Sequence, residues 1–130
     1  PRQRPDLAIH KFARLMLEGK LIPVYGDGST RRDYTYVADI VQGIRAALNY
    51  DKTQYEIINM GNNRTVSLSE MIRTLEEALQ VKAIIERMPS QPGDVPQTWA
   101  SVEKAKRMLG FAPNTDFATG VRSFVASLRE

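Results

Sequence analysis

Residues 25–37 read YGDGSTRRDYTYV, and no other part of the sequence says as much about the fold. A short apolar strand is predicted over residues 21–25, and it runs into a Gly-x-Gly turn. Two arginines, an alternating aromatic strand and a helix follow. This order places Arg32 on a rigid strand edge beside a tight turn, where a planar guanidinium suits bidentate binding of phosphate. The segment therefore predicts a phosphate-binding arginine.

The remainder of the chain alternates helical periodicity with short apolar runs. Apolar spacing and capping residues predict helices over residues 6–18, 37–48, 67–79, 101–109 and 116–128. Strands are predicted over residues 21–25, 33–36, 55–60 and 83–87, with a proline-rich loop over residues 89–96. Because Ile57 and Ile58 are consecutive apolar residues, we expect the strand over residues 55–60 to be buried on both faces, as in a parallel sheet. The order predicts a mixed α/β domain whose few strands form a layer that packs on something larger.

The size and composition are those of one globular domain spanning residues 1–130. The chain is 42% hydrophobic and 25% charged, so a packed core is expected. It has no cysteine, which excludes disulfides and thiolate metal sites and favours a cytoplasmic location. The sequence shows no apolar run of membrane-spanning length and no signal peptide, so no membrane partner is expected.

The charge pattern favours a small anionic ligand. The net charge is +3, and the basic residues are scattered apart from Arg31-Arg32, whereas a nucleic-acid-binding surface would cluster them. No nucleic-acid partner is therefore expected. His10 is the only histidine, and the sequence pattern gives it no triad partner or companion ligand, so no metal site is predicted.

Five segments, in their order along the chain, resemble one enzyme family. They are PRQRPD at residues 1–6, YGDGSTRRDYTYV at 25–37, INMGN at 58–62, QPGDVPQT at 91–98 and KRMLGFAPNT at 106–115. The family is that of the NAD-dependent sugar-nucleotide epimerases and dehydratases, which are extended short-chain dehydrogenases/reductases. The start of the chain most resembles the UDP-glucuronate 4-epimerase-like and UDP-glucose epimerase-type enzymes. The resemblance implies the α/β fold of their C-terminal substrate domain, with the Rossmann NAD-binding domain missing.

Two features that this family needs for catalysis are not found in the sequence. Dinucleotide binding needs a glycine-rich turn that leads into a helix, whereas the turn at residues 26–28 leads into arginines. The family's catalytic pair is a tyrosine with a lysine four residues later, and no tyrosine of this sequence has that lysine. We therefore expect no catalytic or cofactor-binding residue on this chain, a fragment that is inactive alone, and NAD in the intact enzyme only.

The resemblance also implies substrate-binding residues. Arg32 matches the arginine that contacts the diphosphate, and the alternative for it is a surface ion pair with Asp33 or Asp39. Tyr25 and Pro23 match residues that flank the nucleotide base, and the alternative for them is a half-buried strand aromatic with its neighbour.

Four further residues complete the predicted substrate site. Arg4 and Arg2 are expected to reach the sugar or its carboxylate, unless they belong to a frayed terminus. Asp94 either accepts hydrogen bonds from ribose hydroxyls or caps its own turn. Asn59 ends a predicted strand near the site, where ordinary turn chemistry is the alternative. Arg31 is expected to be a solvated neighbour.

The implied partners are a UDP-sugar, the missing N-terminal Rossmann domain and a second copy of the chain. A homo-oligomer is expected because a face built to pack on the cofactor domain would otherwise be an exposed apolar patch. The alternative from a different class is a free-standing, non-catalytic nucleotide or anion-binding module.

Overall fold

The computed structural model describes residue 4 and residues 6–128, and this part of the chain forms five helices and five short strands. The helices are α1 (Ala8–Leu17), α2 (Val37–Leu48), α3 (Leu68–Leu79), α4 (Glu103–Leu109) and α5 (Phe117–Ser127). The strands are β1 (Leu21–Tyr25), β2 (Arg31–Asp33), β3 (Thr65–Ser67), β4 (Ile84–Met88) and β5 (Gln97–Thr98). The predicted mixed α/β class with few strands is confirmed.

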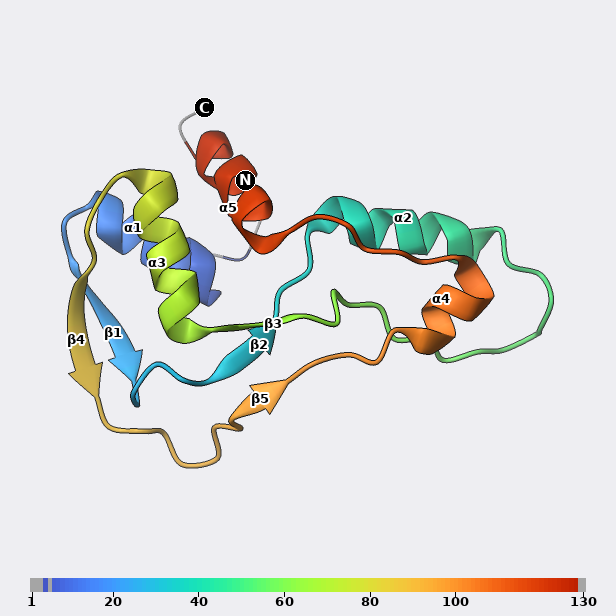
Figure 1. Ribbon diagram of the computed structural model, residues 1–130, viewed down its shortest axis with the longest axis horizontal. Coiled ribbons are helices and arrows are strands. Elements are labelled where there is room, and N and C mark those ends of the chain that lie inside the picture. Colours follow the sequence, from blue (N-terminus) through green and yellow to red (C-terminus); the bar gives the residue numbers. More distant parts are fainter. Residues whose placement is uncertain (1–3, 5, 129–130) are drawn as a thin grey trace.

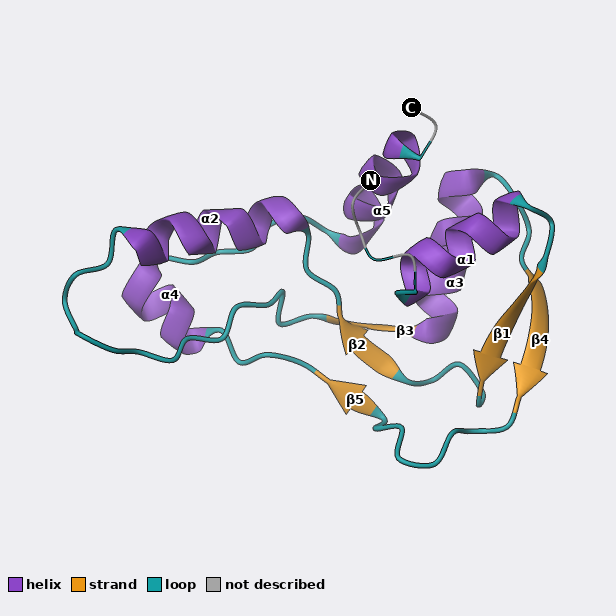
Figure 2. Ribbon diagram, turned by 180° about the vertical axis from the view of Figure 1, so that it is seen from behind, coloured by secondary structure: helices purple, strands orange, loops and turns teal. Residues whose placement is uncertain are grey.

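The molecule is elongated, with two groups of elements at opposite ends of its long axis (Figure 1). One end holds β1, β4, α1, α3 and α5, which we call the β1–β4 lobe. The other end holds α2 and α4, which we call the α2–α4 lobe, and the two groups also stand apart when seen from behind (Figure 2). Strand β1 pairs in parallel with β4, while β2 pairs antiparallel with β3 and parallel with β5. The second sheet, in the order β3-β2-β5, lies between the lobes.

The β1–β4 lobe has a core of its own. Strand β1 alternates, so that Ile22 and Val24 are buried while Tyr25 faces outward. Helix α3 begins with the predicted capping box: the N–H of Glu70 donates to Ser67 Oγ at 3.1 Å, and the N–H of Ser67 donates to the Glu70 carboxylate at 2.7 Å. The buried residues of this core are Phe12, Ala13, Met16, Ile22, Val24, Met71, Ile72, Leu75, Leu79, Val121 and Val125.

The α2–α4 lobe has a much smaller core. Its buried residues are Val102, Ala105 and Phe111, with Ile58, Met60, Ala100 and Leu109 packed against them. Helix α2 approaches this core through Gly43, where an added Cβ would collide with Met60 Sδ and lie 2.8 Å from the Phe111 ring. The apolar residues on the opposite side of α2 are exposed: Val37 by 66%, Val41 by 46%, Ile44 by 48% and Leu48 by 80%.

The predicted strand over residues 55–60 is wrong for this structure. The segment is irregular, and Tyr55 and Ile57 are 78% and 68% exposed rather than buried. Ile58 packs on the small core of the α2–α4 lobe. A strand needs a neighbour to bind its N–H and C=O groups, and none of the described strands pairs with this segment. The C=O of Ile57 accepts a hydrogen bond from Lys104 Nζ at 2.8 Å.

Some predicted boundaries also move. Helix α1 is preceded by Leu7, whose apolar side chain cannot cap it, and the carboxylate of Asp6 pairs with Arg4. The strand expected over residues 33–36 lies earlier, at β2, while Asp116 caps α5 as predicted. In the described part of the chain no helix is long and apolar enough to cross a membrane.

Candidate functional site

Arg32 is held by backbone on both sides. It lies at the centre of β2, opposite Val66 of β3 and Thr98 of β5. The N–H of its neighbour Arg31 also donates to the C=O of Pro96 at 2.8 Å, which fixes the loop before β5 beside β2. Arg32 thus lies on a strand after the glycine turn, as predicted, but this strand is the central one of its sheet and not an edge.

The guanidinium of Arg32 turns toward the proline-rich loop. Its Nη2 donates to Asp94 Oδ1 at 2.5 Å, and its Nη1 donates to the C=O groups of Arg31 and Val95 at 2.8 and 3.0 Å. The two charged side chains are 32% and 38% exposed, so the pair is open to solvent on one side. Two of the predicted substrate-binding residues, Arg32 and Asp94, are therefore in direct contact.

The turn before β2 is shaped by two glycines. Gly26 and Gly28 have φ values of +70° and +88°, a region that other residues rarely adopt. Asp27 Oδ1 accepts hydrogen bonds from the hydroxyl and the N–H of Ser29, and these bonds lower the pKa of Asp27. The turn leads into β2 and not into a helix, so it offers no helix N-terminus to the pyrophosphate of a dinucleotide. The residues at this turn do not fit NAD.

Arg31 is more than the solvated neighbour that the sequence indicated. Its Nε donates to Thr65 Oγ1 at 3.0 Å and its Nη2 donates to the C=O of Thr65 at 2.7 Å. The same Nη2 lies 3.3 Å from the Glu70 carboxylate of the α3 capping box. Because alternate residues of a strand point to opposite faces, Arg31 joins β2 to β3 and α3 while Arg32 faces the loop.

Asp33 ties three segments together at the end of β2. Its Oδ1 accepts from the N–H of Asn62 at 2.9 Å, and its Oδ2 accepts from the N–H groups of Asn63 and Ala100 at 3.0 and 3.3 Å. Gly61 is required beside this carboxylate, since a Cβ there would lie 2.8 Å from both Asp33 Oδ2 and the Ala100 Cβ. The carboxylate thus sets the spacing between β2, the 61–63 turn and the segment after β5.

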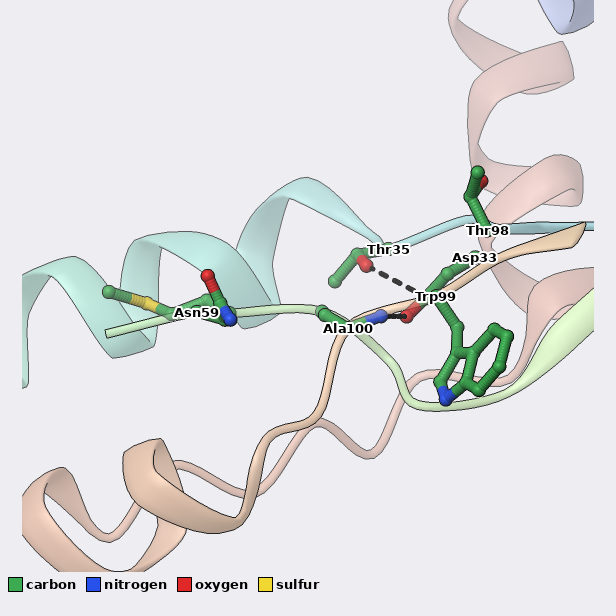
Figure 3. Close-up of a pocket in the computed structure, with 8 residues that line it drawn as sticks. Asp33, Thr35, Asn59, Thr98, Trp99 and Ala100 are labelled. Atoms are coloured by element: carbon green, nitrogen blue, oxygen red, sulfur yellow. Dashed lines mark hydrogen bonds between the residues drawn. The ribbon is translucent and has the colours of Figure 1, made fainter. Parts of the chain in front are cut away.

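A cavity of about 330 Å³ opens next to Asp33. Figure 3 shows Thr35 and Ala100 hydrogen-bonded to Asp33, with Asn59 to the left of these residues and the ring of Trp99 below Asp33. The residues that line it are Asp33, Thr35, Asn59, Met60, Gly61, Thr98, Trp99 and Ala100. Asn59 therefore faces a cavity, while Asp33, Thr98 and Trp99 were missed as site residues by the sequence reasoning.

Tyr25 and Pro23 lie on the outward face of β1. They pair in register with Met88 and Glu86 of β4, and Tyr25 is 36% exposed. The N–H of Gly26 donates to the C=O of Met88 at 3.0 Å, which places the glycine turn directly after this face. The two residues are thus accessible at the end of β1, and neither lines the cavity beside Asp33.

Arg4 is engaged elsewhere. Its Nε and Nη2 donate to the two carboxylate oxygens of Asp6 at 3.1 and 2.5 Å, and this contact lowers the pKa of Asp6. Both side chains are exposed. In the described part of the chain Arg4 is therefore bonded to Asp6 and not to Asp94, and the predicted Arg2 lies outside the described residues.

A second, more apolar cavity of about 700 Å³ lies between α1, α5 and the connection from β2 to α2. Its lining includes Ile9, Tyr34, Tyr36, Phe117, Val121 and Phe124. Nearby, the buried carboxylate of Asp39 accepts from the N–H groups of Asn114 and Thr115 at 3.4 and 3.2 Å. Asp39 thereby fixes α2 to the segment before α5. Across the described residues no cluster of histidine and acidic side chains has the spacing of a metal site.

Comparisons with known proteins identify relatives of the whole chain. The sequence profile of the GDP-mannose 4,6 dehydratase family matches residues 1–124. An uncharacterised protein of Methanocaldococcus jannaschii is 41% identical over 121 residues, which are 93% of this chain and 37% of that protein.

Two solved structures share the fold. A point variant of the UDP-glucuronic acid 4-epimerase from Bacillus cereus, in complex with UDP-4-deoxy-4-fluoro-glucuronic acid and NAD, has a TM-score of 0.88 and 36% identity. The match covers 98% of this chain and 42% of that one. The UDP-glucose 4-epimerase of Thermotoga maritima, solved with UDP-glucose, has a TM-score of 0.90 and 30% identity over 99% of this chain and 42% of that one. The chain thus spans about two fifths of the length of the proteins it matches.

Proposed function

Because the chain belongs to the GDP-mannose 4,6 dehydratase family, we propose that it holds the sugar nucleotide in an NAD-dependent epimerase or dehydratase. It corresponds to the C-terminal part of such enzymes. The proposed ligand is a UDP-sugar, and Arg32 is the residue that binds its diphosphate. The observation that carries the proposal is the backbone-held position of Arg32 on β2, with its guanidinium directed at an accessible loop.

The remaining predicted residues are assigned to the other parts of the ligand. Tyr25, exposed at the end of β1, and the half-buried Pro23 on the same face are proposed to flank the uracil base. Asn59 is proposed to bind the sugar from the cavity beside Asp33. Arg4, together with Arg2, is proposed to reach a carboxylate on the sugar, which requires Arg4 to leave Asp6. Breaking the Arg4–Asp6 pair costs little free energy, because an exposed ion pair contributes little to stability.

Hydride transfer and proton abstraction are proposed to depend on a separate NAD-binding domain. NAD supplies the hydride acceptor when it is bound, and the general base acts on the sugar hydroxyl beside it. Among the described residues of this chain, Arg32 is the one proposed to bind the diphosphate, and polar groups lie near it. Their role in the reaction is to bind and orient the sugar nucleotide. Residues 1–130 are accordingly proposed to be one substrate-binding domain that is inactive alone.

The exposed apolar residues of α2 and of residues 55–57 are proposed to pack on that NAD-binding domain. Side chains such as Leu48 and Tyr55, at 80% and 78% exposed, recover free energy only when another surface covers them. When the cofactor domain is not present, a second copy of the chain is proposed to cover the same apolar residues, which would give a homo-oligomer.

Titration with UDP tests this function. The 130-residue chain and the same chain fused to the NAD-binding domain of a relative are to be titrated with UDP and UDP-glucuronate by calorimetry. Arg32→Ala is expected to weaken both ligands by about tenfold or more, because a hydrogen bond to a charged group contributes about 1.5–3 kcal/mol. Arg32→Lys should recover only part of the affinity, since an ammonium lacks the planar fork. Arg122→Ala, at an exposed position on α5, is the matched control for loss of one positive charge.

Two further measurements separate the parts of the proposal. Arg4→Ala should weaken UDP-glucuronate while leaving UDP unchanged. The isolated chain should not epimerise UDP-glucuronate with NAD added, whereas the fusion should. If Arg32→Ala binds UDP as tightly as the parent, the diphosphate assignment is wrong. Two results together would instead favour the free-standing, non-catalytic anion-binding module. These are equal UDP affinity for the isolated chain and the fusion, and no epimerase activity of the fusion.

A further inference from the structure

We propose that Asp94 is a positioning residue, which orients the guanidinium of Arg32 so that its Nε–Nη2 edge faces the diphosphate. The inference rests on the proposed function and assigns to Asp94 a different role from a contact with ribose or a cap of its own turn. It follows from which N–H groups of Arg32 are already used in the structure.

The guanidinium has five N–H donors in a fixed plane, two on each Nη and one on Nε. Both donors of Nη1 are used, by the C=O groups of Arg31 and Val95. Nη2 uses one donor, to Asp94 Oδ1. None of the hydrogen bonds of Arg32 in the described structure involves Nε.

The unused donors lie on one edge. Val95 and Asp94 are adjacent in the loop and bind one Nη each, so together they occupy the end of the fork between Nη1 and Nη2. The second N–H of Nη2 then points to the same side as Nε–H. Two parallel N–H groups of this kind match two oxygens of a phosphate, which is the bidentate geometry that distinguishes arginine from lysine.

The position of Asp94 is set by its loop. The N–H of Asp94 donates to the C=O of Gln91 at 3.2 Å, across a turn in which Gly93 has a φ of +85°. The loop begins after β4, which pairs with β1, and ends at β5, which pairs with β2. Both ends are thus fixed beside the two strands that carry Tyr25 and Arg32. An acceptor held in this way can fix the rotamer of a long arginine side chain that would otherwise lose entropy on binding.

A positioning role and a competing role predict opposite effects. If Asp94 fixes the fork, its removal weakens every ligand that uses the free edge. If the carboxylate instead competes with phosphate for the guanidinium, its removal strengthens binding. A contact from Asp94 to ribose would be lost only for ligands that contain ribose.

The experiment uses UDP and inorganic pyrophosphate as probes for the same set of variants. Asp94→Ala, Asp94→Asn and the parent chain are titrated with both ligands at low ionic strength. Asp51→Ala is the matched control, because Asp51 is exposed between α2 and residue 55 and its loss changes the net charge equally.

Relative to Asp51→Ala, Asp94→Ala is expected to weaken UDP and pyrophosphate by the same factor, about tenfold. Asp94→Asn keeps an oxygen acceptor for Nη2 and should stay within about threefold of the control. Combining Asp94→Ala with Arg32→Ala should cost no more than Arg32→Ala alone, because the carboxylate acts through the arginine.

Each other result overturns the positioning role. Weaker binding of UDP with unchanged pyrophosphate would assign Asp94 to ribose, and tighter binding of both would make it a competitor. Equal affinities of Asp94→Ala and Asp51→Ala, or a parent that binds UDP but not pyrophosphate, would exclude an oriented diphosphate edge. A parent chain that fails to bind UDP, alone and in the fusion, would refute the proposed function itself and the positioning role with it.

Discussion

Helices α2 and α3 have the same length but differ in how many of their apolar side chains are buried in their lobes. Helix α3 buries Met71, Ile72, Leu75 and Leu79, all within the β1–β4 lobe. The buried residues of α2 are Asp39 and Gly43, so none of its larger apolar side chains is buried. One lobe is built around side chains of its own, while the other leaves Val37, Val41, Ile44 and Leu48 of α2 exposed.

This difference indicates which part of the chain folds around its own core. Full burial of a valine, leucine or isoleucine contributes about 1.5–3 kcal/mol, and α2 keeps four such residues largely exposed. The β1–β4 lobe carries Tyr25, and the sheet beside it carries Arg32, so the proposed nucleotide site rests on the better-packed part. The proposed cofactor-domain contact lies on the less-packed part.

The largest effect is expected from truncation in the core of the β1–β4 lobe. Leu75 is fully buried, and Leu75→Ala should lower the free energy of unfolding by about 2–5 kcal/mol, through lost burial and a cavity. The matched change in the other lobe is Phe111→Ala, at a residue only 2% exposed. It should shift the main urea transition less, although it removes more volume, because its lobe contributes less to the cooperative core. Equal or reversed shifts in the urea midpoint would contradict two unequal lobes.

Hydrogen exchange should show the same contrast without mutation. Amides in the last two turns of α2 are expected to exchange at least about a hundredfold faster than those in the middle of α3, because local opening needs few buried contacts to break. Mass spectrometry of the exchanged chain measures this directly. In a fusion with an NAD-binding domain the protection of α2 should rise while that of α3 stays constant. If the amides of α2 were already as protected as those of α3 in the isolated chain, the exposed apolar face of α2 would not lower its local stability.

The parts of the fold that could be predicted from sequence are those with a local cause. The Ser67–Glu70 capping box and the glycine turn at residues 26–28 are set by residues close together in the chain, and both are confirmed. The strand predicted over residues 55–60 was wrong, because a buried strand needs a neighbouring strand and the described chain provides none.

The candidate site was predictable only in part, and for a similar reason. The contact between Arg32 and Asp94 joins residues 62 positions apart, and only the family resemblance placed both in one site. Asp33 was missed because its partners are the backbone N–H groups of Asn62, Asn63 and Ala100. Every residue but proline has such a donor, so no sequence pattern marks which ones a carboxylate will bind.

Asp33 lies between the lobes and should couple them. Asp33→Asn replaces one acceptor oxygen by a donor that faces backbone N–H groups, and leaving such groups unsatisfied costs about 1–3 kcal/mol. The only tryptophan, Trp99, precedes one of those donors, so its fluorescence emission should shift toward that of free tryptophan. Asp51→Ala, on an exposed loop, should change neither stability nor emission. An unchanged Trp99 spectrum in Asp33→Asn would mean that this carboxylate does not hold the cavity wall.

The smallest effect is expected at the start of α3, where Glu70 closes the capping box of the better-packed lobe. The hydrogen bond from the Ser67 N–H, with the nearby Arg31, lowers the pKa of Glu70. A lowered pKa in the folded state means that the stabilisation is fully present above the unfolded pKa and is lost as pH falls through the folded value. Because the side chain is 44% exposed, solvent screening limits the contribution to about 0.5 kcal/mol.

Glu70→Gln measures that contribution, because glutamine keeps the hydrogen-bonding oxygen and removes only the charge. The parent should be more stable than Glu70→Gln by urea unfolding at pH 7, and the difference should decrease as the pH falls through the lowered pKa of Glu70. Several other carboxylates also become protonated over this range, so only the difference between the two proteins is informative. Glu77→Gln, on the same helix and outside the capping box, is the control for the loss of one carboxylate. If the stability difference between the parent and Glu70→Gln does not decrease as the pH is lowered, the charge of Glu70 contributes nothing to the stability of α3.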